Sequence, residues 1–211
     1  MLLLQGIPSV PTPTDTLRLR AIAGPPAADG RIDSATWGPA QLRIATAQGQ
    51  ASVWLLRAAD TAFVAVAVPD RSRSWADGVA VCFDIAGDRA AAPAHDDFQW
   101  SLQRVLDSSV VYRGRAERWE APRGDPDWRL GAARAGGGWE VSGADDGTVW
   151  SFVLRLDPAW LHGEQGRRPG IGFLIHDDDP NRWYSWPLVT APAGAKLLER
   201  TPALWVPLEL P

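Results

Sequence analysis

The stretch HDDDPNRW, residues 176–183, combines carboxylates with an imidazole, the side chains that hold metal ions. Asp177, Asp179 and Asn181 have the spacing of the first three ligands of a calcium loop. An EF-hand is excluded, because Arg182 stands where that loop needs glycine and Leu188 where it needs glutamate. Two interpretations stay open: a calcium site built from two loops, and turn aspartates that are simply solvated.

A second acidic stretch, HDDF at 95–98, offers no recognisable catalytic pattern. Three histidines without zinc spacing argue against a zinc site, and the single methionine, Met1, excludes an interior Met–His haem. The chain contains no nucleophile elbow, P-loop or dinucleotide fingerprint. We therefore expect no enzyme and no cofactor other than structural calcium. A hydrolase acting through the acidic loops is the remote alternative.

Twelve tryptophans are more than the packing of 211 residues requires. Trp54, Trp100 and Trp150 have apolar neighbours at strand spacing, which predicts core positions. Five others lie beside Gly, Pro, Asp or Arg in expected loops, where flat aromatic faces could contact sugars or proteins. These candidates are Trp37, Trp75, Trp119, Trp128 and Trp183.

The elements that must position these residues are almost all strands. Short runs of alternating or continuous apolar residues, separated by Gly, Pro and Asp turns, recur from Leu17 onward and predict a β-sandwich or barrel. The clearest expected strands are 51–57, 63–68, 79–85, 98–106, 109–116, 149–156, 170–175, 182–186 and 203–210. Helical signals are confined to single turns at 33–40 and 157–163.

We expect an extended proline-rich arm at 1–16 and a single domain at 17–211. The apolar start of the arm is too short for a membrane span and lacks the features of a complete signal peptide. The membrane role that stays open is contact of residues 1–10 with the membrane surface. A net charge of −4 without basic runs argues against nucleic-acid binding, and a lone Cys82 in an apolar run excludes a disulfide framework.

The order of these pieces resembles the family 9 carbohydrate-binding modules and the wider DOMON-like sandwiches. The similarity covers most of residues 28–186 and is carried by ADGRIDSATWGPA (28–40), AFVAVAVPD (62–70), VAVCFD (79–84), DDFQW (96–100), VWSFVLRLDPAWL (149–161), RPGIGFLIHDDD (168–179) and WYSW (183–186). It implies an all-β, immunoglobulin-like antiparallel sandwich.

The resemblance also implies a sugar held between two tryptophans, with an acidic and a basic side chain bonding its hydroxyls. Trp75 matches the first tryptophan, but Ala80 stands at the acidic position and Gln99 at the basic one. The segment 189–203 contains no second tryptophan. Such a site should bind sugar weakly, because desolvated hydroxyls need hydrogen-bond partners. The family's structural calcium adds the strand-end residue Asp84 and its counterpart Asp70 to the candidate ligands named above.

Our preferred hypothesis is a non-catalytic accessory domain that docks onto a larger membrane-associated protein assembly outside the cytoplasm. The expected contacts are the arm and the residues Trp75, Gln99, Trp119, Trp128, Arg182, Trp183 and Trp186. The alternative is a glycan-binding module with a rearranged site that uses Trp183 or Trp186 with the 176–182 loop. The resemblance, rather than a signal sequence, implies a periplasmic or extracellular location.

Overall fold

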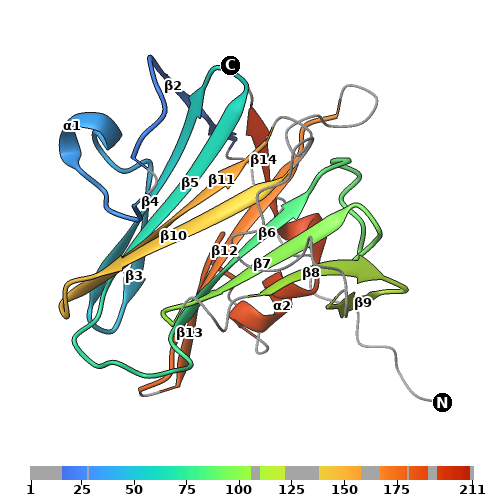
Figure 1. Cartoon of the computed structure of the whole chain (residues 1–211). Coiled ribbons are helices and arrows are strands. Elements are labelled where there is room, and N and C mark those ends of the chain that lie inside the picture. Colours follow the sequence, from blue (N-terminus) through green and yellow to red (C-terminus); the bar gives the residue numbers. More distant parts are fainter. Residues whose placement is uncertain are drawn as a thin grey trace.

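The computed structural model describes residues 16–27, 29–105, 110–121, 138–157, 167–179, 181–189 and 194–209. Two β-sheets pack face to face as the layers of a sandwich (Figure 1). The arm at 1–15, Trp128 and the expected helical turn after Asp157 lie outside the described residues. No helix among the described residues is both long and apolar enough to cross a membrane.

The larger sheet has the strand order β1-β14-β12-β6-β7-β8-β9, with β13 also paired to β12. Its strands are β1 (Leu17–Arg18), β6 (Gly78–Asp84), β7 (Asp97–Gln103), β8 (Val110–Arg115), β9 (Arg118–Glu120), β12 (Gly170–Asp177), β13 (Arg182–Trp186) and β14 (Val206–Glu209). All pairings are antiparallel except the short edge pair β1–β14.

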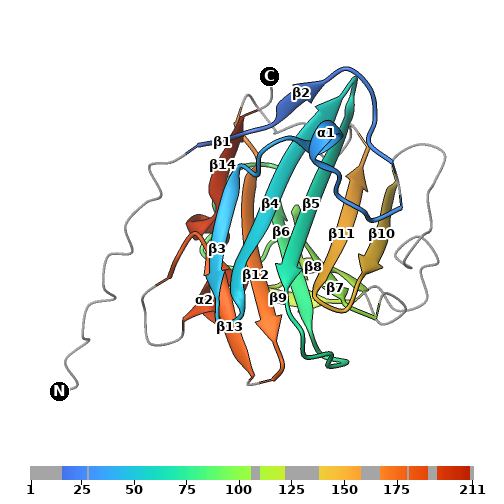
Figure 2. The same ribbon diagram turned by 90° about the vertical axis from the view of Figure 1, so that its left-hand side faces the viewer.

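The smaller sheet has the order β10-β11-β5-β4-β2, and β3 also pairs with β4 (Figure 2). Its strands are β2 (Arg20–Ile22), β3 (Leu42–Thr46), β4 (Gly49–Ala58), β5 (Thr61–Pro69), β10 (Trp139–Asp145) and β11 (Val149–Leu156). Only the edge pair β2–β4 is parallel. The structure thus confirms the predicted β-sandwich and adds two short parallel pairs at sheet edges.

The core between the sheets follows from the period-two alternation of the strands. On β7, Phe98, Trp100 and Leu102 point inward and are buried. β6 is buried along its whole length, as its continuous apolar run predicted. Its inward residues belong to the core, whereas Ala80 and Cys82 face outward and belong to a second apolar cluster.

Two short helices cover the outer faces of the sheets. The turn predicted at 33–40 is α1 (Ser34–Trp37), capped by Asp33, whose side chain accepts a hydrogen bond from the Thr36 amide. Trp37 is completely buried against the smaller sheet. The prediction of a contact tryptophan in a loop is therefore wrong for Trp37.

The helix α2 (Ala195–Glu199) was not predicted from the sequence. It lies on the outer face of the larger sheet (Figure 1), where Leu198 and Cys82 belong to one buried apolar cluster. A 3₁₀ turn at Pro202–Leu204 follows it and leads into β14. The second apolar cluster, which includes Trp205, forms because α2 and this turn cover an otherwise exposed patch of small outward residues on β6.

Candidate functional site

A cleft of about 550 Å³ lies on the outer face of the larger sheet, beside α2. Its floor is the outward side of β7, where Gln99, Ser101 and Gln103 follow one another at alternate positions. Tyr112 of β8 is in register with Gln99 and extends this polar floor. The alternation that sends apolar residues of β7 into the core therefore sends hydrogen-bonding groups into the cleft.

Two tryptophans contribute to the walls of the cleft. Trp183 of β13 stacks on His176 of β12, with ring centroids 4.1 Å apart, and the Lys196 ammonium lies 5.2 Å from its centroid. Trp119 of β9 stacks on Trp205, and its indole N–H donates to the Glu199 carbonyl oxygen at 2.9 Å. Both aromatic side chains are held in place before any ligand arrives.

The cleft has a carboxylate that the sequence did not reveal. Glu199, the last residue of α2, accepts a hydrogen bond from the Gln99 amide at 3.0 Å and lines the cleft. Ala80 also lines the cleft and is too small to fill this space. The family resemblance implied an acidic residue on β6, at the position of Ala80. The structure instead places a carboxylate from α2 beside Gln99.

The other predicted contact residues lie elsewhere. Trp75 is 77% exposed and is not part of the cleft wall, although its neighbour Ala76 is. Trp186 faces inward and packs on Phe173, and Arg182 is exposed at the start of β13. The structure thus brings Gln99, Trp119 and Trp183 together and leaves the remaining described candidates outside the cleft.

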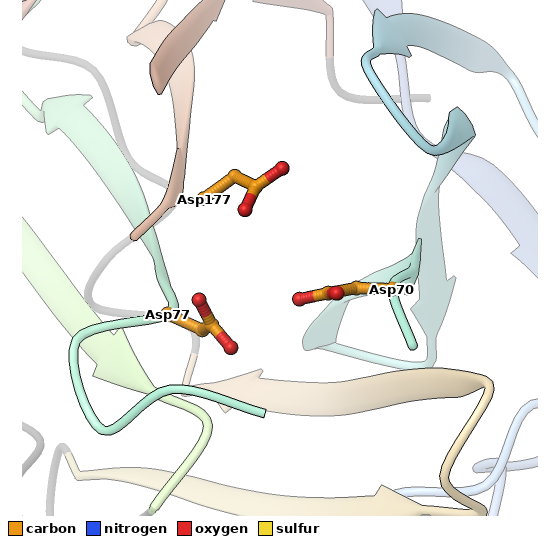
Figure 3. A group of neighbouring side chains, drawn as sticks. All are labelled: Asp70, Asp77 and Asp177. Carbon is orange, nitrogen blue, oxygen red and sulfur yellow. The ribbon is translucent and has the colours of Figure 1, made fainter. Parts of the chain in front are cut away.

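A cluster of buried carboxylates lies at the end of the sandwich next to the cleft (Figure 3). Asp70, Asp77 and Asp177 each offer an oxygen, and these oxygens lie within 4.8 Å of one another. Arg104 is buried beside them and pairs with Asp70 and Asp77, both at 3.3 Å. Burial, followed by the charges of Asp70 and Asp77, raises the pKa of Asp177. Its expected co-ligand Asp179 is exposed and lies outside the cluster.

This cluster fits the calcium that the family resemblance implies. Its ligand atoms are all carboxylate oxygens, the donors that hard cations such as Ca²⁺ prefer. Asp177 is 6% exposed, and its Oδ1 has no hydrogen-bond partner among the described residues. An orphaned carboxylate oxygen in a buried acidic cluster is a position at which a bound cation would be favourable.

The remaining calcium candidate, Asp84, belongs to a separate acidic group. It ends β6 directly opposite Asp97, the first residue of β7, and both side chains are fully buried. Burial raises the pKa of Asp97 to about 8 and that of Asp84 to about 6. The predicted calcium ligands therefore do not form one group: Asp70 and Asp177 lie in the first cluster and Asp84 in the second. Asp179 lies in neither.

Sequence reasoning missed Tyr112, Glu199, Asp77 and Arg104. Tyr112 follows from the β8 alternation once its register with Gln99 is known. The run AKLLE after Gly194 carries a signal for α2, because its residues are good helix formers. Nothing in the sequence pairs Arg104 with Asp70, since these residues meet only through the packing of the two sheets.

No protein-family model matches the chain, and no curated protein matches its sequence. The fold is a two-sheet β-sandwich with a cleft on the outer face of the larger sheet. Two solved structures of a family 9 carbohydrate-binding module from Caldicellulosiruptor kristjanssonii have similar folds. The complex with glucose superposes with a TM-score of 0.57 at 16% identity, covering 92% of this chain and 95% of that chain. The complex with cellotriose gives 0.56 at 16% identity, with 92% and 93% covered. The chain therefore has the family 9 carbohydrate-binding-module fold, as the resemblance implied.

Proposed function

We propose that this chain is a non-catalytic module that binds carbohydrate in the cleft beside α2. The observation that carries the proposal is the pairing of aromatic walls, Trp119 and Trp183, with a polar floor. The apolar face of a sugar ring packs on an indole, and its hydroxyls need several hydrogen-bond partners. The two structurally similar modules were solved with glucose and cellotriose, which supports the same ligand class here.

The dimensions of the cleft suit a small saccharide. Its volume of about 550 Å³ lies within the range of about 300–1,000 Å³ that is typical of small-molecule sites. It is an open groove between β13 and the β8–β9 hairpin, so a terminal sugar and its neighbour can both reach the floor.

Gln99, which was among the predicted contacts, and Glu199, which was not, supply the polar recognition. The amide offers donors and an acceptor, and the carboxylate accepts charge-assisted hydrogen bonds from hydroxyl groups. Their mutual hydrogen bond of 3.0 Å holds both in the free protein. Less side-chain entropy is then lost when the ligand binds. Weak binding was expected from Ala80, from Gln99 at the basic position and from the lack of a tryptophan in 189–203; Glu199 answers the first of these by supplying a carboxylate.

Calorimetric titration with glucose and with cellotriose tests the proposal. We expect heat of binding with the wild type, and an affinity at least about tenfold lower in Gln99→Ala and Glu199→Gln, because each loses about 1.4 kcal/mol of hydrogen bonding. The matched control is Gln50→Ala, an exposed glutamine on β4 of the opposite sheet. The proposal would be contradicted if neither sugar gave heat of binding, or if both cleft variants kept full affinity.

The accessory-domain hypothesis is supported by one described feature, the exposed indole of Trp75. Trp75 has 77% of its surface exposed, and tryptophan is among the residues that most often anchor protein–protein contacts. Trp75→Ala separates the two roles. If the variant keeps its sugar affinity, the indole does not contribute to sugar binding and stays a candidate for a protein contact. If the affinity falls, Trp75 contributes to the rim of the cleft next to Ala76.

A glycan-binding role places the chain where polysaccharides are found. We therefore keep the expectation of a periplasmic or extracellular location. Cell fractionation with an antibody against the chain tests it, and recovery in the cytoplasmic fraction alone would argue against it.

A further inference from the structure

Two arginines of the cleft have no part in the recognition described above. Arg118 of β9 and Arg200, the residue after α2, both line the cleft and are both exposed. Within the described part of the chain, neither guanidinium group has an ion pair or a hydrogen bond. Arg115 of the same hairpin differs, because it pairs with Glu120 at 3.6 Å. The guanidinium groups of Arg118 and Arg200 are therefore available to a ligand.

The two arginines are distant in sequence, but the elements that carry them are in contact. The Trp119 indole N–H donates to the Glu199 carbonyl oxygen at 2.9 Å. The residue after Arg118 thus contacts the residue before Arg200, and β9 lies beside α2 (Figure 1). Both arginines therefore border the same side of the cleft.

The turn that precedes Arg118 has a backbone conformation that is costly for its residues. Only Ala116 and Glu117 join β8 to β9, since Arg115 and Arg118 are in register. Both turn residues have positive φ, 48° and 64°, as a two-residue hairpin of this type requires, but Asn and Gly adopt these angles more readily. Such conformations are concentrated at sites that hold ligands. A turn this short also fixes the position of Arg118 beside the aromatic wall.

Basic side chains outnumber acidic ones around the cleft, although the whole chain has a net charge of −4. Two carboxylates of the described residues line it, Glu117 and Glu199. Three cations oppose them: Arg118, Arg200 and the Lys196 ammonium, which lies over one of the aromatic walls. A concave surface with this balance attracts an anion more strongly than a neutral molecule.

The chemistry of the guanidinium group indicates which anion fits. It is planar and donates hydrogen bonds in a fork that matches the two oxygens of a carboxylate. A carboxylate carried on a sugar ring suits the rest of the cleft as well. The apolar face of the ring can pack on Trp119, and its hydroxyls can reach Gln99 and Tyr112. Uronic acids combine these two properties.

We propose that the cleft selects acidic saccharides, with Arg118 and Arg200 binding the carboxylate of a uronic acid residue. This selectivity rests on the proposed carbohydrate binding and adds a charged group to the ligand. The pair of Gln99 and Glu199 binds hydroxyls, which neutral and acidic sugars share. The two arginines then distinguish the acidic sugar from the neutral one.

Calorimetric titration with glucose, glucuronate and glucosamine at neutral pH and low ionic strength tests this selectivity. The three sugars share a pyranose ring and carry no charge, a negative charge and a positive charge. We expect glucuronate to bind at least about tenfold more tightly than glucose, because its carboxylate adds charge-assisted hydrogen bonds. Glucosamine should bind no more tightly than glucose. Added salt should reduce the preference for glucuronate, since it screens exposed charges.

Substitution of the arginines assigns the preference to them. Arg118→Gln and Arg200→Gln should each lower the affinity for glucuronate about threefold, and the double variant about tenfold, with a smaller effect on glucose. Arg115→Gln is the matched control: it removes an equal charge from the same hairpin, directly opposite Arg118, at a position that does not line the cleft. All three side chains are exposed, so the variants should fold, and their urea midpoints check this.

The selectivity is overturned if glucose binds as tightly as glucuronate, if the double variant keeps the preference, or if Arg115→Gln loses as much affinity as Arg118→Gln. Tighter binding of glucosamine would also overturn it and would assign charge recognition to Glu117 and Glu199. In each of these cases a sugar still binds, so the proposed function stands. Absence of heat with all three sugars would instead contradict the proposed function together with the selectivity.

Discussion

The stability of the fold should fall as pH rises through the neutral range, because two buried carboxyl groups face each other at the start of the β6–β7 pairing. Asp84 and Asp97 are in register, and both are completely buried. Asp97 accepts one hydrogen bond, from the Ala94 amide at 2.7 Å, and its Oδ1 has no partner among the described residues. Burial is the main cause that raises the pKa of Asp97 to about 8 and that of Asp84 to about 6.

The sign of the effect follows from proton binding by the two states. The folded chain keeps the Asp97 proton up to a pH of about 8, whereas the unfolded chain releases it near the ordinary aspartate pKa of about 4. The folded state therefore binds more protons, so the stabilisation is complete at low pH and is lost as pH rises toward 8. One proton corresponds to about 1.4 kcal/mol per pH unit, so we expect the free energy of unfolding to fall by about 2–3 kcal/mol between pH 6 and pH 8.

Urea denaturation at pH 6, 7 and 8 in the presence of a chelator measures this dependence. Asp97→Asn imitates the protonated side chain and should remove most of the decrease. Asp60→Asn is the control: its carboxyl group is exposed, and the variant keeps all three histidines that titrate in the same range. The reasoning is refuted if the wild type is equally stable at pH 6 and pH 8, or if Asp97→Asn and Asp60→Asn show the same decrease.

Two further substitutions test the packing and the charge network. Trp37→Ala should lower the free energy of unfolding by about 3–5 kcal/mol, since it empties a completely buried site beneath α1, whereas Trp75→Ala at an exposed site should change it by less than about 0.5 kcal/mol. Arg104→Met should cost about 3–5 kcal/mol, because Asp70 and Asp77 lose their buried counter-ion. Urea midpoints of the variants measure both effects, and a near-neutral Arg104→Met would show that the carboxylates are compensated by another cation.

The sandwich could be predicted from the sequence because each strand carries its own evidence. The alternation on β7 and the continuous apolar run of β6 report which sides are buried, and the structure confirms both. The capping of α1 by Asp33 is equally local. Trp37 shows the limit of such evidence: a tryptophan beside Gly38 and Pro39 has the neighbours of a loop residue, yet the turn that precedes it folds back over the smaller sheet.

The composition of the cleft could not be predicted, because its parts are distant in sequence. Gln99 and Glu199 are separated by 100 positions and meet only after α2 packs on β6. The two aspartates of the 176–183 stretch show a similar limit. Asp177 and Asp179 are indistinguishable by composition, but the last residue of β12 is buried while the turn residue two positions later is exposed.

The acidic side chain of a binding site can come from any element that lies close enough to the site. Ala80 on β6 removed the expected carboxylate from the strand, and this absence was one of the three reasons for predicting a weak site. Ala80 and Glu199 line the same cleft, and the small side chain of Ala80 leaves room there for Glu199 to contact Gln99. The residue that appeared to abolish the sugar site thus creates the space in which another carboxylate replaces it. A large residue introduced at Ala80 should therefore crowd the Glu199 side chain and weaken sugar binding even where it restores the acidic group.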